Sequence, residues 1–570
     1  MRGRDFARNE RLPWLALFAV FIGVLSTLGA WLLLGMIRFF TQLFFFQRIS
    51  GSEVSPATHT LGAWVIVVPA IGGLIVGLMA RYGSEKIRGH GIPEALEAIL
   101  FGKSRMSPKV AVLKPLSSGI VIGSGGPFGA EGPVIMTGGA AASLLAQAFH
   151  LTAAERKALL VAGACAGMTA VFGTPIAAIL LAVELLLFEL RPRSLLPVAV
   201  ACAVAGFLRP MWATTGPLFP MQTAPVETIA IVSCIVAGLC AGALSAVMTR
   251  LLYWVEDAFE RLPVHWMWWP TLGGLVVGLG GWFEPRALGV GYDVIADLLA
   301  HNMVLGTVLA LLAVKILIWS VALGSGTSGG VLAPLLMIGA GLGYVLSPWL
   351  PGGDARLWAL VCMAATLGGT MRAPLMAILF AFELTGNSHA LLPLVLGCTT
   401  AYGFSVVVMP RSILTEKIAR RGLHVYREYG VDPLERSFVD EVMTREVVSI
   451  PANMAIASAR ATFFGPDQSH RGYPVVDGTT LLGLVRREDL ASATEGRIRD
   501  VLHGIGPVAM LGETCRSVAA RMAATGVERL PVVDAENRHA LVGIVSRSDL
   551  LAPARGTHED EMPRERFYGS

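Results

Sequence analysis

The stretch with the clearest chemical content is residues 123–139, GSGGPFGAEGPVIMTGG, which is rich in glycine and carries one carboxylate, Glu131. Apolar runs on both sides place it at membrane depth, where an ionisable side chain is costly and usually functional. Its glycines leave backbone N–H groups free to point at a ligand. Pro133 marks the start of an apolar helix from Val134 to about Phe149, whose first N–H groups favour an anion. The stretch therefore holds a carboxylate or a small anion, or it is a packing turn with a salt-bridged glutamate.

The composition indicates the class of protein around this stretch. Of 570 residues, 54% are hydrophobic and 15% are charged, and the mean hydropathy is +0.62. A soluble protein carries about a quarter charged residues, so we expect an α-helical polytopic membrane protein. The net charge of +4 is too small to indicate nucleic-acid binding, and the seven cysteines include no CxxC pair. Neither a disulfide framework nor a zinc or other metal site is expected.

The apolar segments must position Glu131 within the bilayer. Residues 1–12 contain four arginines before a long apolar run, which predicts a cytoplasmic leader into a first membrane helix. Several later apolar segments are shorter than the ~20 residues needed to span a bilayer. Broken helices persist at membrane depth only where they are buried in protein or line a cavity.

A repeat organises these segments. Three motifs recur in the same order about two hundred residues apart, which indicates a duplicated membrane unit. The matching pairs are 89–91 with 289–291, 123–133 with 324–334, and 173–185 with 372–384. The membrane unit then covers residues 13–422, with repeats at about 13–211 and 226–422. Paired broken helices whose N-termini converge near the midplane are a common way to build an anion site.

The composition changes after this unit. Residues 437–553 read as soluble α/β structure and are themselves duplicated, with GYPVVD and LGLVRRED in the first copy matching RLPVVD and VGIVSRSD in the second. We expect a linker at 423–436, two halves at about 437–492 and 497–553, and a disordered charged tail at 554–570.

The ordered motifs GHGIP (89–93), GAEGP (129–133) and GVLAP (330–334) resemble those of the CLC family of chloride channels and anion/proton exchangers, and the tail resembles a pair of CBS domains. The resemblance implies an inverted repeat and a homodimer with one anion pathway per subunit. It also implies a multi-pass protein of the cell membrane, the bacterial inner membrane, with both termini and the CBS pair cytoplasmic. Lys417, Arg420 and Arg421 after the last apolar run agree with that orientation.

The resemblance also implies the site residues. Glu131 would be a gate whose carboxylate competes with anions for the outer end of the pathway. Backbone amides of Gly132, Val331 and Leu332 would hold desolvated anions. Lys114 falls where the family has a buried lysine beside the pathway, or it is a lysine that snorkels from a helix end.

The sequence departs from the family pattern at four positions. His90, Ala130, Leu332 and Leu414 stand where the family has serine, arginine, phenylalanine and tyrosine. Both hydroxyls of the central site are missing while the backbone donors remain, so chloride is the expected anion and nitrate or fluoride stays open. His90 is a candidate hydrogen-bond donor to the anion, or a histidine at a helix start that faces water.

Proton coupling depends on the inner end of the pathway. Family exchangers have a second glutamate directly after the position of Glu184, but this sequence has Leu185 there, as the channels do. The Arg191-Pro192 pair lies four residues later than expected, about one helical turn, which makes Glu189 an alternative inner acid. Water is a third route past Leu185, so we expect exchange, with an uncoupled chloride channel as the alternative.

The CBS-like segment 543–549, GIVSRSD, resembles a nucleotide-binding version, with Ser546 and Ser548 near phosphate and Asp549 on the ribose. The alternative is a dimerising scaffold with an empty cleft. No cofactor is required, and adenine nucleotide is the candidate ligand. A membrane-anchored nucleotide sensor is the second functional hypothesis. An enzyme is not expected, because no nucleophile–base pair or phosphate-binding loop appears.

Overall fold

The computed structural model of the chain describes residues 11–425, 433–465, 468, 470, 472–490, 495–502, 504–534, 537 and 539–552. Contacts divide it into two compact units that separate at about residue 427. Parts of three expected segments lie outside the described residues: the leader up to residue 10, linker residues 426–432, and the tail at 554–570.

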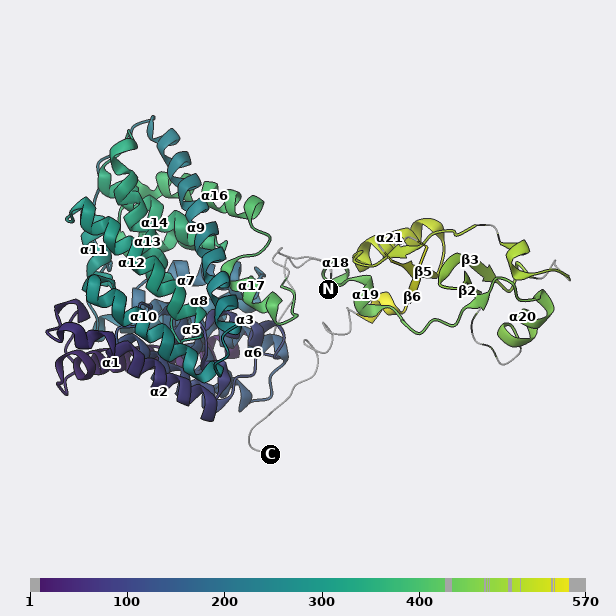
Figure 1. Ribbon diagram of the computed structural model, residues 1–570, viewed down its shortest axis with the longest axis horizontal. Coiled ribbons are helices and arrows are strands. Elements are labelled where there is room, and N and C mark those ends of the chain that lie inside the picture. Colours follow the sequence, from purple (N-terminus) through teal and green to yellow (C-terminus); the bar gives the residue numbers. More distant parts are fainter. Residues whose placement is uncertain are drawn as a thin grey trace. The chain divides into compact units, whose positions relative to one another are not determined.

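The first unit is built from helices packed side by side (Figure 1). Its first repeat contains α1 (Leu12–Phe46), α2 (Val68–Tyr82), α3 (Ile92–Leu100), α4 (Pro108–Gly123), α5 (Glu131–Gln147), α6 (Ala153–Phe172), α7 (Pro175–Leu181), a π-helix (Ala182–Leu187) and α8 (Pro192–Leu208). Its second repeat contains α9 (Ala230–Glu260), α10 (Trp269–Phe283), α11 (Tyr292–Ala300), α12 (Leu305–Gly324), α13 (Leu332–Leu346), α14 (Ala355–Met371), α15 (Pro374–Thr385), α16 (Leu391–Val408) and α17 (Ile413–Arg420).

These helices include long spans and short buried pieces. Among the described residues, seven helical segments are long and apolar enough to cross a bilayer: Leu12–Phe46, Gly62–Tyr82, Pro192–Met211, Ala230–Glu260, Leu305–Gly324, Leu332–Trp349 and Ser388–Arg420. Others, such as α3, α7 and α11, are too short to cross, and most of their side chains are buried or partly buried by neighbouring helices. The expected α-helical polytopic fold is confirmed.

The start of α5 differs from the sequence expectation. The helix begins at Glu131 and not at Val134, with Ala130 as its N-cap. Proline has no N–H but fits anywhere in a first turn, where that N–H would have no partner, so Pro133 sits inside the turn and does not open it. Glu131 is therefore the first helical residue, and its side chain lies beside the free amides of a helix start.

Reciprocal contacts relate the two repeats. Gly330 N–H donates to Gly129 O at 3.0 Å, and Gly129 N–H faces Gly330 O at 3.4 Å. Glu184, in the π-helix of the first repeat, accepts from the amides of Leu375 and Met376 at the start of α15, at 3.1 and 2.7 Å. Equivalent residues that bond to each other in both directions are what an approximate two-fold relation produces.

The second repeat makes the reciprocal carboxylate contact. Glu383 of the second repeat accepts from Ile176 and Ala177 at the start of α7, at 3.0 and 2.8 Å. Each short helix thus has its unpaired first amides satisfied by a carboxylate from the other repeat. These two helices pack against each other, so the carboxylates fasten the repeats together at membrane depth.

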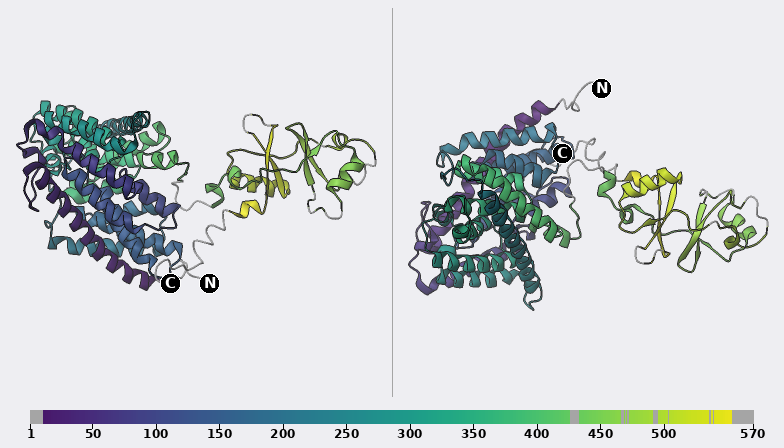
Figure 2. Two further views of the ribbon diagram at one scale, coloured as in Figure 1. Left: turned by 60° about the horizontal axis from the view of Figure 1, so that its bottom comes forward. Right: turned by 90° about the horizontal axis from the view of Figure 1, so that it is seen from above.

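The second unit repeats one α/β pattern (Figure 2). One sheet contains β1 (Ile450–Pro451), β2 (Gly472–Asp477) and β3 (Thr480–Arg486), and the other contains β4 (Ala509–Met510), β5 (Arg529–Val533) and β6 (Leu541–Ser546). In each sheet the first pair is parallel and the second antiparallel. Irregularities at equivalent places, Val475/Val476 and Val532/Val533, extend the likeness. The helices are α18 (Pro433–Arg436), α19 (Val439–Val442), α20 (Ile456–Phe463) and α21 (Cys515–Thr525).

We predict that the two reciprocal carboxylates stabilise the fold equally. Glu383→Gln and Glu184→Gln each replace a charge-assisted bond pair, worth about 1.5–3 kcal/mol for each such bond, by a weaker neutral contact. We expect the thermal unfolding midpoint of the purified protein in detergent to fall by about 2–5 °C in both variants. A fall in the Glu383 variant alone would mean that the carboxylate of Glu184 serves another purpose than holding the repeats.

Candidate functional site

The Glu131 carboxylate crosses from one repeat to the other. The side chain is fully buried, and its Oε1 accepts a hydrogen bond from Ala333 N–H at 3.1 Å. Ala333 lies in the first turn of α13, where amides have no partner within the helix and the dipole favours negative charge. The carboxylate therefore occupies a helix N-terminus that could equally hold a small anion.

Several buried polar atoms of this region have no partner in the part of the chain that the structure describes. Glu131 Oε2, both ring nitrogens of His90 and the Tyr292 hydroxyl are buried and make no hydrogen bond with the described residues. Nearly all buried polar groups in folded proteins are paired, so an unpaired set points to a ligand, water or proton that belongs there. The motif 89–91 and its counterpart 289–291 supply His90 and lead directly into Tyr292.

His90 lies inside the protein and does not face water. Only 1% of its surface is exposed. Its carbonyl oxygen packs so closely on Gly132 that a Cβ at residue 132 would overlap with it. Only glycine fits there, and this contact brings the first motif against the turn of Glu131. The expected alternative of a solvent-facing histidine is wrong.

The amides that the sequence analysis named lie at two helix starts. Gly132 is the second residue of α5, Val331 is the N-cap of α13, and Leu332 is its first residue. Their backbones meet through the Gly129–Gly330 bridge. Leu332 and Leu414 are both fully buried, so apolar side chains stand where the family resemblance would place larger or hydroxylated ones.

Lys114 is a buried residue and not a snorkelling one. Its Nζ donates to Ile87 O and Gly89 O, both at 2.8 Å, and its side chain has no exposure. Lys315 does the same in the second repeat, donating to Ala287 O at 2.9 Å and Gly289 O at 3.1 Å. Each lysine thus holds the backbone at the first glycine of its motif, residue 89 or 289, and two residues before it. Lys114 also brings positive charge next to His90.

Two cavities approach these groups. One, of about 920 Å³, is lined by Tyr292 and by the charged residues Arg38, Glu53, Arg209 and Asp293. The other, of about 690 Å³, is lined by Glu94 and by the basic residues Lys86, Arg88, Arg105, Lys417, Arg420 and Arg421, together with Glu85, Glu97, Glu256 and Glu260.

The second cavity is linked to the neighbour of His90 by a hydrogen bond from its lining residue Glu94. Glu94 Oε2 accepts from Gly91 N–H at 3.0 Å, and Gly91 is the neighbour of His90. The first cavity reaches Tyr292 directly. One cavity is thus lined by Tyr292 itself, and the other by Glu94, which bonds to the residue after His90.

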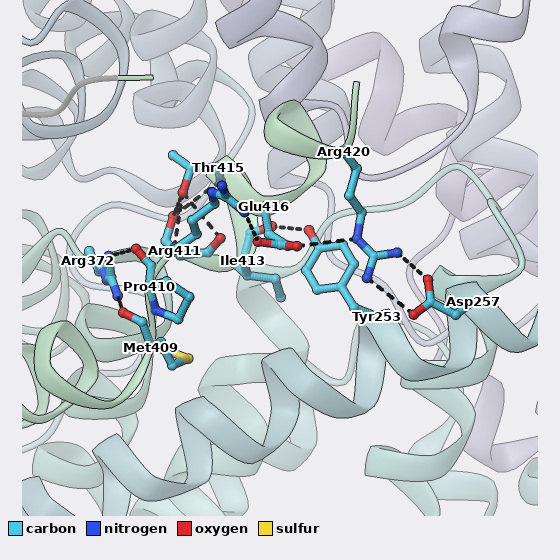
Figure 3. Close-up of polar contacts among 11 residues, drawn as sticks. Tyr253, Asp257, Arg372, Met409, Pro410, Arg411, Ile413, Thr415, Glu416 and Arg420 are labelled. Carbon is cyan, nitrogen blue, oxygen red and sulfur yellow. Dashed lines mark hydrogen bonds and ion pairs between the residues drawn. The ribbon is translucent and has the colours of Figure 1, made fainter. Parts of the chain in front are cut away.

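α17 forms part of the wall beside the second cavity, and Figure 3 shows how it is held. The Tyr253 hydroxyl from α9 donates to Ile413 O at 2.5 Å, and Arg420 reaches over the Tyr253 ring to pair with Asp257. Ile413 precedes Leu414, so these contacts fix the backbone next to the position where a hydroxyl is missing. Tyr253 carries no motif that sequence analysis could have used.

The proton-route candidates have separate surroundings. Both oxygens of Glu184 accept amide bonds from α15. Glu189 accepts from Ser194 Oγ at 2.5 Å and lies 3.7 Å from Arg191. Between them the chain forms the π-helix Ala182–Leu187 and then a left-handed residue, Phe188. The segment between the two acids is therefore not a regular α-helix.

The candidate nucleotide residues bond to one another in the second unit. Asp549 Oδ2 accepts from Ser546 N–H and Ser546 Oγ, both at 2.8 Å, and the Ser546 and Ser548 hydroxyls lie 2.8 Å apart. Asp489 makes the equivalent contact, accepting from Arg486 N–H at 2.8 Å, although its copy lacks the hydroxyls. The carboxylate contact is therefore common to both copies, and only the hydroxyl pair is special to the second.

Comparison with known proteins agrees with both units. The family model for the voltage gated chloride channel matches residues 72–406, and the CBS domain model matches residues 439–496 and 507–554. The voltage-gated ClC-type chloride channel ClcB of Salmonella dublin is 33% identical over 422 residues, covering 71% of this chain and 98% of the relative. A putative ClcB-like chloride channel protein of Ralstonia nicotianae is 30% identical over 366 residues, covering 62% and 85%.

Solved structures show the same fold. A slow cyanobacterial Cl⁻/H⁺ antiporter has a TM-score of 0.63 at 22% identity and covers 73% of this chain and 99% of its own. A eukaryotic CLC transporter has the same TM-score at 18% identity and covers 94% of this chain and 98% of its own. The chain belongs to the voltage-gated chloride channel (CLC) family and carries a C-terminal pair of CBS domains.

Proposed function

We propose that the protein carries small monovalent anions, chloride foremost, across the membrane, with Glu131 as the gate. One observation carries this proposal: the Glu131 carboxylate occupies the start of α13 through Ala333 N–H. A carboxylate and an anion compete for one set of amides, so a passing anion requires the carboxylate to leave. The similar proteins of Salmonella dublin and Ralstonia nicotianae are described as chloride channels, which supports chloride as the transported anion.

Backbone donors, with His90 in place of hydroxyls, would bind the anion. The amides of Gly132, Val331 and Leu332 lie at helix starts, and the neutral imidazole of His90 offers one ring N–H. Backbone amides respond to the charge and size of an anion more than to its chemical type. Nitrate and fluoride are therefore alternative substrates to chloride in this proposal. One structure of the same fold is a fluoride/proton antiporter.

Coupling to protons is part of the proposal. Once protonated, Glu131 loses its charge and its attraction to α13, so the same group can carry a proton and clear the pathway. Glu189, Glu184 and water past Leu185 remain the candidate inner routes. An uncoupled channel is the alternative, and the structural neighbour named as a Cl⁻/H⁺ antiporter supports exchange.

We place the protein in the bacterial inner membrane as a homodimer, with termini and CBS pair cytoplasmic. The basic residues after α16 support this orientation. The CBS pair would bind adenine nucleotide at Ser546, Ser548 and Asp549 and regulate transport. A membrane-anchored sensor is the competing function, and it needs no gate carboxylate at a helix start.

The first test is anion flux and its dependence on Glu131. Liposomes that contain the purified protein should release chloride when the potential is clamped, and an outward chloride gradient should drive protons inward. Glu131→Gln mimics the protonated gate, so its chloride flux should persist, lose its pH dependence through this group and move no protons. A wild-type protein that moves no small monovalent anion would favour the sensor.

The second test concerns His90. His90→Leu removes the donor at similar volume, and we expect chloride affinity to fall about tenfold, the value of one hydrogen bond to an anion. His90→Ser keeps a donor and should bind chloride more nearly as the wild type does. Chloride titration by calorimetry measures both, and unchanged affinity in the leucine variant would show that the ring does not meet the anion.

The third test concerns the CBS pair. Asp549→Ala should weaken binding of ATP, ADP or AMP to the full-length protein, while Asp489→Ala, which removes the matching contact from the other copy, should not. Calorimetric titration with each nucleotide compares them. The scaffold alternative holds if the wild type gives no heat at millimolar nucleotide.

A further inference from the structure

Tyr292 is a residue that the sequence motifs do not single out. It is the first residue of α11 and follows Gly291, whose φ of +75° turns the chain into the helix. Its ring lies edge-on to Phe172 at 6.1 Å and to Phe219 at 6.2 Å between centroids. Packed aromatic neighbours fix the ring, so the direction of its hydroxyl is also fixed.

The Tyr292 hydroxyl lies near the Glu131 carboxylate. Neither the hydroxyl nor Glu131 Oε2 completes a hydrogen bond in this arrangement. The other carboxylate oxygen, Oε1, is already bonded to Ala333 N–H. An unpaired buried donor therefore lies close to an unpaired buried acceptor.

The two repeats differ at this position. The residue equivalent to Tyr292 in the first repeat is Ile92, which begins α3 and has no polar atom. A phenylalanine would fill the space between Phe172 and Phe219 equally well. The hydroxyl is therefore not needed for packing, and it faces the one carboxylate on which the proposed gate depends.

We propose that Tyr292 is a positioning residue for the gate: its hydroxyl donates to Oε2 of ionised Glu131 and holds the carboxylate in the blocking position. This inference rests on the proposed function. Two donors of the second repeat, Ala333 N–H and Tyr292 Oη–H, then hold the two oxygens of one carboxylate. Protonation of Glu131 weakens both contacts and frees the side chain. Because Tyr292 lines the 920 Å³ cavity, the release occurs where anions arrive.

The direction of the effect follows from the charge. A hydrogen bond donated to a carboxylate favours its ionised form, so loss of the hydroxyl should let Glu131 protonate, and the pathway open, at higher pH. The charged groups that line the cavity beside Tyr292, which stay unchanged in the test, are Arg38, Glu53, Arg209 and Asp293.

The test measures chloride efflux from liposomes over a series of pH values. For Tyr292→Phe we expect the midpoint of acid activation to rise by about one pH unit, the value of one such bond, with an unchanged plateau at low pH. Tyr292→Leu, which also lacks the hydroxyl, should move the midpoint the same way. Tyr344→Phe is the matched control, since Tyr344 is a buried tyrosine whose hydroxyl bonds to Met303 O.

The Glu131→Gln background separates this role from a structural one. Adding Tyr292→Phe to Glu131→Gln should change nothing, because the group that the hydroxyl acts on no longer titrates. A midpoint equal to that of the wild type in both Tyr292 variants overturns the inference and leaves the gate intact. An effect that persists in the Glu131→Gln background also overturns it. Absence of anion flux in the wild type overturns the proposed function, and this inference with it.

Discussion

A charged side chain inside a membrane protein must find donors there, and Glu131 finds its donor in the other half of the molecule. The bond from Ala333 N–H exists only because α13 starts at membrane depth, opposite the start of α5. Two helix starts can meet in this way only if the backbones come very close. Glycine at 129, 132 and 330 permits that approach, since a Cβ at any of them would overlap with a neighbour.

Ionic side chains also satisfy the backbone at four other interrupted helices of the described residues. Broken helices leave amides and carbonyls without partners, which lipid cannot satisfy. Glu184 and Glu383 satisfy the amides of α15 and α7, and Lys114 and Lys315 satisfy the carbonyls before α3 and α11. Each ionic group in these two pairs has its counterpart in the other repeat. Glu131 has none, because Leu332 stands at the position that matches it.

This asymmetry separates the charges that hold the fold from Glu131, the proposed gate. A charged residue found at equivalent positions of both repeats stabilises the fold. A charged residue found in one repeat alone is available for a role in transport. By this criterion Lys114 belongs first to the fold, because Lys315 makes the same two contacts. His90 and Tyr292 belong with Glu131, because their counterparts Val290 and Ile92 are apolar. All three carry unpaired buried atoms, which supports the same division independently.

Much of this arrangement could be predicted from the sequence. Composition, the ordered glycine motifs and the repeat indicated the helical membrane fold, and the change of composition near residue 423 indicated the α/β pair. The reciprocal contacts of Glu184 and Glu383 could not be predicted, because they join residues about two hundred positions apart that no local pattern links. Tyr292 was missed for a related reason: its importance comes from a neighbour in the other repeat. The start of α5 was misplaced because proline is compatible with several positions of a first turn.

The π-helix at Ala182–Leu187 separates the contacts of Glu184 from those of Glu189. Glu184 lies within this π-helix and accepts its two bonds from α15. The chain then widens, turns at Phe188 in a left-handed conformation and reaches Glu189 near Arg191 and Ser194. Leu185, directly after Glu184, is buried in the π-helix, so an acid at that position would face the interior. Glu189 instead lies at the partly exposed end of the segment, where a proton can be exchanged with water. The segment thus separates Glu184, which joins the repeats, from Glu189, which is partly exposed, so the two candidate acids of the proposed proton route have different places in the fold.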